Sequence, residues 1–194
     1  MFETPQLAAA SAWLRGIFAV ARTLRALLER LGALVSWLVL AMALLTAVVV
    51  VLRYFFQFGS IALQESVTYL HAAVFMLGAA YAAQRDQHVR VDIFYRHFAR
   101  RTQLLVNVLG TLLLLLPVTA LLFFYSFDYV AASWALAERS SDSGGLAFRY
   151  LLKSLLLLLP LLMWLHAVVL LVESGLEWFG YLQAPEQIGT EGAL

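Results

Sequence analysis

Four long apolar runs constrain this chain more than any other feature of its sequence. They cover residues 32–52, 66–84, 103–127 and 151–172, and each is 19 to 25 residues long. A helix rises about 1.5 Å per residue, so each run can cross a hydrocarbon layer about 30 Å thick. Lys153, near the start of the fourth run, is the only Asp, Glu, Lys or Arg inside them. The pattern predicts an all-α integral membrane protein with four transmembrane helices.

The composition agrees with a membrane protein and excludes several other classes. Hydrophobic residues make up 63% of the chain and charged residues 13%, whereas a soluble domain has about 45–50% and about 25%. The net charge of +1 provides no basic surface for nucleic acid. Without cysteine, the chain has no disulfide, thiolate metal site or cysteine nucleophile. We expect residues 1–194 to form a single membrane domain that binds no nucleic acid.

Basic residues are distributed unequally between the two sides of the predicted spans. Nine of the 13 precede the first run or lie between the second and third runs. The other side carries four, namely Arg53, Arg139, Arg149 and Lys153. Because Lys and Arg concentrate in cytoplasmic segments, this distribution predicts a cytoplasmic N-terminus. Four spans return the C-terminus to the cytoplasm as well.

Two further segments have the pattern of amphipathic helices that lie on the membrane surface. Residues 7–31 place apolar side chains on one broad face, with Arg15, Arg22 and Glu29 opposite. The second segment, residues 93–101, follows Asp92 as a predicted N-cap. Basic amphipathic helices favour the headgroup region of anionic leaflets. We therefore expect membrane lipids among the partners of the chain.

The polar residues give no support for an enzyme. The spans contain no carboxylate pair, no hydrolase triad and no metal-ligand cluster with a credible spacing. His71 and His166 could be axial ligands of a haem in a four-helix electron-transfer protein. Their predicted depths differ by roughly 13 Å, which is too much for one iron. A stand-alone assembly or adhesion protein is a third hypothesis, and the absence of cysteine counts against its usual disulfide.

The segment from Arg53 to Tyr95 carries motifs that hydropathy does not explain. It contains Arg53-Tyr54, then Gln64-Glu65 at the start of the second span, then Gly78-Ala79-Ala80, then a stretch from Arg85 to Asp92. This order resembles the small, Q-type (DctQ-like) membrane subunit of tripartite ATP-independent periplasmic (TRAP) transporters. Gln64 departs from the family, which often has an acidic residue there.

The resemblance implies a subunit that does not itself carry the substrate. In that family a large M-type subunit holds the substrate and sodium sites and moves as an elevator, and a periplasmic binding protein delivers an organic anion. The small subunit scaffolds the large one in the bacterial inner membrane. The resemblance thus implies a multi-pass subunit of a sodium symporter, with no cofactor in this chain and sodium in its large partner.

The candidate functional residues fall into two sets. The predicted structural or assembly residues are Arg53, Glu65, Gly78, Ala82, His88, Arg90 and Asp92. The residues predicted to dock a binding protein are Trp134, Glu138, Arg139, Asp142 and Arg149.

Two pairs of these residues carry explicit alternatives. Arg53 and Glu65 either form an ion pair between consecutive spans or face the headgroups separately. The small residues Gly78 and Ala82 allow close helix packing, either within the chain or against a partner.

Overall fold

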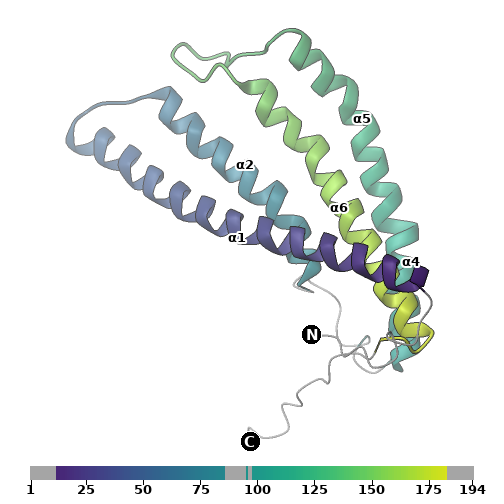
Figure 1. Ribbon diagram of the computed structural model, residues 1–194. Helices are drawn as coiled ribbons and strands as arrows, with labels where there is room; N and C mark the ends of the chain where they lie inside the picture. Colours follow the sequence, from purple (N-terminus) through teal and green to yellow (C-terminus); the bar gives the residue numbers. More distant parts are fainter. Residues whose placement is uncertain (1–11, 86–94, 96–97, 183–194) are drawn as a thin grey trace, which may run out of the picture.

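The computed structural model describes residues 12–85, 95 and 98–182, and all the regular secondary structure of these residues is helical (Figure 1). Four helical stretches are long and apolar enough to cross a membrane. The first two are α1 (Ala12–Phe55) and α2 (Ile61–Gln84). The third combines α4 (Arg100–Gly110), the π-helical turn η2 (Thr111–Leu115) and α5 (Leu116–Ala135), and the fourth is α6 (Arg149–Trp178). The prediction of an all-α protein with four membrane spans is confirmed.

Helix α1 is much longer than the first apolar run. Its 44 residues extend about 66 Å, more than a bilayer of about 40–45 Å including headgroups. The structure thus differs from the prediction of a surface helix at 7–31 separate from a span at 32–52, because one helix runs from residue 12 through the end of the predicted span. Only Gly32 stands at the predicted junction, and a single glycine does not end a helix. Of the second predicted surface helix, 93–101, residues 93, 94, 96 and 97 lie outside the described residues, and Arg100 and Arg101 belong to α4.

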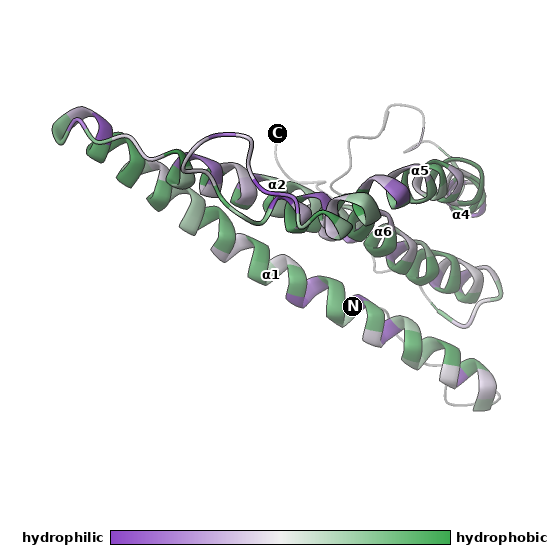
Figure 2. Ribbon diagram, turned by 90° about the horizontal axis from the view of Figure 1, so that it is seen from above, coloured by the Kyte–Doolittle hydropathy of each residue, from purple (hydrophilic) through white to green (hydrophobic). Residues whose placement is uncertain are grey.

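The helices form an open layer. Helix α1 packs on α2 and α6, α2 packs on α6, and α5 packs on α6 at the other edge. Seen from above, α2, α6 and α5 stand in a row with α1 alongside (Figure 2). The α1–α2 and α5–α6 hairpins converge at one end and separate toward their connecting loops (Figure 1). We call the end with loops 56–60 and 136–148 the loop end, and the end where α2 and α6 finish the terminal end.

The buried core is small and lies where the hairpins converge. Leu28 of α1, Ala80 and Ala83 of α2, and Leu162 and Met163 of α6 form its main cluster. A second cluster joins Leu176 and Leu182 to Leu14 and Phe18 of α1. It holds the first turns of α1 against the end of α6. Many large apolar side chains are left exposed, among them Trp37 at 70%, Phe124 at 68% and Leu44 at 60%.

Local signals explain how the spans begin and bend. Ser60 caps α2 by accepting a hydrogen bond from the Leu63 amide at 3.4 Å. In the third span, η2 directly precedes the first turn of α5, which contains Pro117. Proline cannot donate a helical hydrogen bond and its ring crowds the preceding turn. The Leu116 amide accordingly bonds back to the Thr111 carbonyl, five residues earlier.

Candidate functional site

At the loop end, Glu65 joins the start of α2 to the connection between α5 and α6. Its carboxylate accepts hydrogen bonds from the Ser140 hydroxyl and from the Leu146 amide, the latter at 2.6 Å. Ser140 and Leu146 are also held together by a backbone hydrogen bond of 2.9 Å. Gly145 lies so close that a Cβ there would be 2.4 Å from the Ser140 Oγ. One carboxylate thus fixes the fold of the loop against α2.

A second carboxylate of the loop end, Glu138, ties the end of α5 to α6. It accepts hydrogen bonds from Lys153 of α6 and from Ser133 of α5, the latter at 2.7 Å. The hydrogen bond from Lys153, followed by that from Ser133, holds the pKa of Glu138 below its ordinary value. The Lys153 ammonium also lies 3.9 Å from the centre of the Tyr129 ring. Lys153 is therefore paired at the start of its span.

The other predicted docking residues gather at the same end. Trp134 donates a hydrogen bond to the Ser154 Oγ at 2.8 Å, and its ring packs on Tyr150 with centroids 4.7 Å apart. Arg149 donates to the Ser141 Oγ at 3.3 Å. Arg139 and Asp142 are exposed. The structure therefore brings all five residues of this set to one surface, together with Glu65.

Arg53 does not join this cluster. It is exposed on the last turn of α1 and lines a small crevice with Phe58 and Gln64. Among the ion pairs of the described residues none links Arg53 to Glu65, so the predicted hairpin ion pair does not form. The physical reason is that the loop after α5 supplies hydrogen-bond donors to Glu65.

The small residues of α2 pack within the chain. A Cβ at Gly78 would lie 3.4 Å from Val35 of α1, and a Cβ at Gly32 would lie 2.2 Å from the Tyr81 ring. Ala82 is partly buried. For Gly78 the structure thus favours packing within the chain over a seam with a partner. His88, Arg90 and Asp92 lie outside the described residues.

At the terminal end, a polar network joins three helices. Arg25 of α1 forms an ion pair with Glu173 of α6. In the amide orientation of Gln84 that satisfies both neighbours, its oxygen accepts hydrogen bonds from Nε and Nη2 of Arg25 at 3.2 and 3.1 Å, and its nitrogen donates to Nδ1 of His166 at 3.2 Å. His166 is buried. The last turn of α2 is thus bonded to both neighbouring helices.

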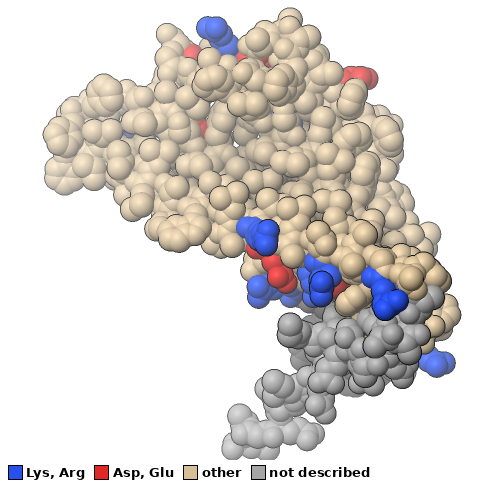
Figure 3. Space-filling view, in the orientation of Figure 1, with Lys and Arg blue, Asp and Glu red and all other residues tan. Residues whose placement is uncertain are grey.

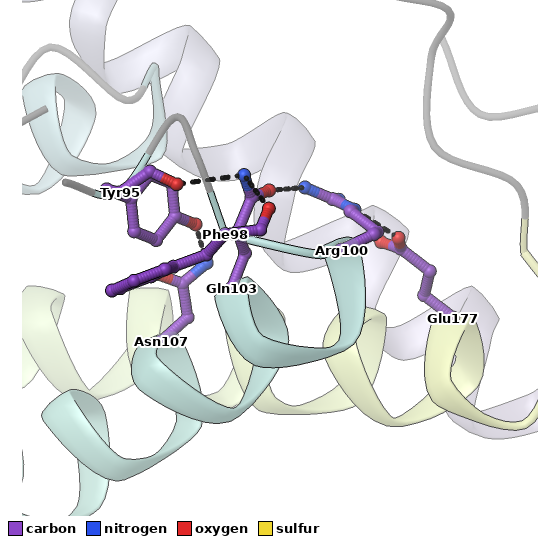
Figure 4. Close-up of polar contacts among 6 residues, drawn as sticks. All are labelled: Tyr95, Phe98, Arg100, Gln103, Asn107 and Glu177. Carbon is purple, nitrogen blue, oxygen red and sulfur yellow. Dashed lines mark hydrogen bonds and ion pairs between the residues drawn. The ribbon is translucent and has the colours of Figure 1, made fainter. Parts of the chain in front are cut away.

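A second network at this end fixes the beginning of α4 (Figure 4). Arg100 binds both carboxylate oxygens of Glu177, at 2.5 and 2.8 Å, and donates to Gln103 at 3.2 Å. The Gln103 amide donates to the carbonyls of Tyr95 and Phe98 at 3.1 and 3.2 Å. Asn107 donates to the Tyr95 hydroxyl at 2.9 Å. These contacts fasten the segment before α4 to α6.

The two networks meet at a cavity of about 130 Å³ between α1, α2, α4 and α6. Among the residues that the structure describes, the charged ones that line it are Arg25, Arg100, Glu173 and Glu177. Figure 3 shows basic and acidic side chains gathered toward this end of the molecule, whereas the middle surface is almost free of them.

The histidines and carboxylates of the described residues give no support to a metal or haem site. No group of three or more His, Asp or Glu side chains in this part of the chain is placed to hold a metal ion. His166 contacts Gln84, which is 13 residues along α2 from His71, a distance of about 20 Å. The two histidines therefore cannot ligate one haem iron.

Sequence reasoning missed the networks at the terminal end. Glu173 and Glu177 are spaced for one helix face, which is a signal for a shared polar surface. Their partners Arg25 and Arg100, however, are 148 and 77 residues away in the sequence. Hydropathy cannot show which helices meet.

Comparison with known proteins gives one match. The family model of the DctQ component of tripartite ATP-independent periplasmic transporters matches residues 42–175. No curated protein and no solved structure matches the chain. The matched residues include Arg53, Glu65, Gly78 and the stretch from Arg85 to Asp92, which carry the resemblance found in the sequence. That resemblance is confirmed.

Proposed function

The chain belongs to the DctQ component family of tripartite ATP-independent periplasmic transporters, and we propose that it scaffolds the large membrane subunit of such a transporter. It is a small, multi-pass membrane component that works with other subunits. In our proposal the large subunit moves as an elevator and carries sodium with an organic anion. A periplasmic binding protein delivers that anion, and the complex lies in a bacterial inner membrane.

The observation that carries the scaffold proposal is the open layer of helices without charges in its middle. Asp, Glu, Lys and Arg are absent from residues 31–52, 66–84, 102–127 and 154–172. A carrier needs polar or ionisable groups near the midplane to bind ions and substrate. Large apolar side chains such as Trp37 and Phe124 are instead exposed. Such a surface suits contact with lipid and with a second membrane protein.

We assign the loop end to the periplasm and the terminal end to the cytoplasm. The unequal distribution of Lys and Arg supports this orientation. The exposed side chains Trp134, Arg139 and Asp142 then face the compartment of the binding protein. Glu65 and Glu138 hold the loop that presents them, so the docking surface is preformed.

We assign no cofactor to this chain and place sodium in the large subunit. The alternative of a haem-bearing electron-transfer protein needs two ligands within reach of one iron. The separation of about 20 Å between His71 and the neighbourhood of His166 argues against it.

Purification of the tagged full chain in mild detergent tests the scaffold proposal. We expect a large polytopic membrane protein to elute with it in a stoichiometric amount, as measured by mass spectrometry. A stable, monodisperse chain that elutes alone from cells expressing the whole transporter would contradict the proposal. Arg139→Glu serves as a matched variant, because it alters the exposed loop end and leaves the membrane surface intact. It should reduce binding-protein docking while the membrane complex persists.

A further inference from the structure

The cavity at the terminal end lies at the depth where lipid headgroups begin. Glu173 is the first charged residue after the uncharged residues 154–172 of α6. Arg100 stands just before the uncharged residues 102–127 of the third span. Gln84 ends the uncharged stretch of α2. All three line the cavity, so it opens where the hydrocarbon layer gives way to the polar interface.

The lining of the cavity combines both signs of charge with an apolar side. Arg25 and Arg100 supply two positive charges, and Glu173 and Glu177 supply two negative charges from one face of α6. Ala83, Leu104, Val169 and Leu170 are apolar residues of the lining. A simple anion would meet both carboxylates, and a simple cation would meet both guanidinium groups. A ligand with one charge of each sign fits this arrangement better.

We propose that this cavity binds the headgroup of a phospholipid that carries a phosphate and a primary ammonium. The phosphate lies toward Arg25 and Arg100, since guanidinium groups are the preferred protein donors to phosphate. The ammonium lies toward Glu173 and Glu177, each of which is paired with one of these arginines. Phosphate and ammonium thus extend the two ion pairs without leaving an excess of either charge. The start of the acyl chains contacts Leu104 and Leu170. The lipid thus contacts all four helices that meet at this end.

This site goes beyond the scaffold function and does not require it. A lipid in this site contacts four helices at once, so it binds only when these helices are assembled around the small core. Ligand bound to the folded state alone stabilises that state. The proposed lipid therefore stabilises the junction of the two hairpins, where the buried apolar cluster of Leu28, Ala83 and Met163 is also found.

Native mass spectrometry of the full chain, purified with its partner membrane subunits, tests the proposal. The bound lipid is first removed from the complex. Phosphatidylethanolamine, phosphatidylglycerol or inorganic phosphate is then added separately, and the binding and the melting temperature are measured for each. We expect phosphatidylethanolamine to bind and to raise the melting temperature. Phosphatidylglycerol, which lacks the ammonium, should act much more weakly, and inorganic phosphate should have no effect.

Two variants and a control connect the binding to the cavity. Arg100→Gln removes a phosphate donor, and Ser174→Leu fills the cavity while it leaves both ion pairs in place. Arg100→Gln should lower retention of phosphatidylethanolamine by roughly tenfold, the effect of losing one charge-assisted contact. Ser174→Leu should lower retention at least as much, because its side chain occupies the space of the headgroup. Arg22→Gln changes an exposed arginine of α1 outside the cavity and should retain wild-type binding.

Three results would overturn the proposal. The first is unchanged phosphatidylethanolamine retention in Ser174→Leu. The second is equal stabilisation by phosphatidylglycerol, which would remove the role of the two carboxylates. The third is an equal shift with inorganic phosphate, which would make the cavity a site for free anions.

Discussion

Substitution of Gly32 by alanine tests the contact that sets the distance between α1 and α2. A Cβ at this position would lie 2.2 Å from Cδ2 and 2.3 Å from Cγ of Tyr81. Ordinary carbon contacts lie at about 3.5–4.0 Å, so the two groups must separate by more than 1 Å. Rotation of the ring about its own axis leaves Cγ in place and gives no relief. Either the Tyr81 side chain leaves its position or the helices move apart.

The expected cost follows from overpacking, which typically amounts to about 1–3 kcal/mol. Alanine also favours a helix over glycine by about 0.5–1 kcal/mol, so the net loss of stability is smaller. Gly16→Ala isolates the packing term, because Gly16 lies in the same helix with no atom within 4 Å of an added Cβ. We expect Gly32→Ala to be less stable than Gly16→Ala by about 1–3 kcal/mol.

Unfolding in mild detergent, followed by circular dichroism, measures this difference. The double variant Gly32→Ala/Tyr81→Ala should recover part of the overpacking cost, because the side chain that clashes is gone. Equal stability of Gly32→Ala and Gly16→Ala would refute the close contact between α1 and α2.

The remaining predictions concern the loop end. Glu65→Ala should lower the melting temperature more than Gln64→Ala, because Glu65 holds Ser140 and the Leu146 amide whereas Gln64 is exposed; similar melting temperatures would contradict the assigned contacts. The pKa of Glu138 is lowered in the folded chain, so its contribution to stability is present above the ordinary pKa of glutamate and is lost as the pH falls below it. The wild type should accordingly melt above Glu138→Gln at neutral pH, and the gap should close in acid; a gap independent of pH would contradict the pairing with Lys153. The chain has no cysteine, so a single Ser143→Cys variant reports its own side of the membrane: an impermeant maleimide should label it from the periplasm, and labelling only after the membrane is opened would reverse the proposed orientation.

The number of spans could be predicted because each hydrophobic run is bounded by charge. The ends of the helices could not be predicted, because a helix continues past its apolar residues wherever the polar side chains that follow can remain exposed. Helix α5 passes the exposed Asp128 and ends at Ala135, and α6 runs to Trp178, six residues beyond Val172. Helix α1 likewise includes most of the predicted surface helix. The length of an apolar run indicates which part of a helix can cross the hydrocarbon layer, but not how far the helix extends beyond it.

The candidate site was predictable in its location but only partly in its contacts. The docking set gathers at one end because the α5–α6 connection is short enough to hold its members together. The sequence left open whether Glu65 pairs with Arg53, its neighbour across the hairpin, or faces the headgroups separately; in the structure the loop 75 residues further along supplies Ser140 as its partner. Pairings between distant segments depend on how the hairpins meet. A single hydropathy pattern carries no information about that arrangement.

Crosslinking between this chain and the large membrane subunit tests the scaffold claim most directly. Because native cysteine is absent, single cysteines at the exposed positions Trp37 and Phe124 can each be paired with single cysteines in the stationary part of the large subunit. The transport rate is measured in proteoliposomes before and after the crosslink forms. Our account predicts that one of these positions crosslinks efficiently and that transport continues at its original rate. Transport that stops on crosslinking and returns on reduction would show that this chain moves during the cycle, and would contradict a scaffold role.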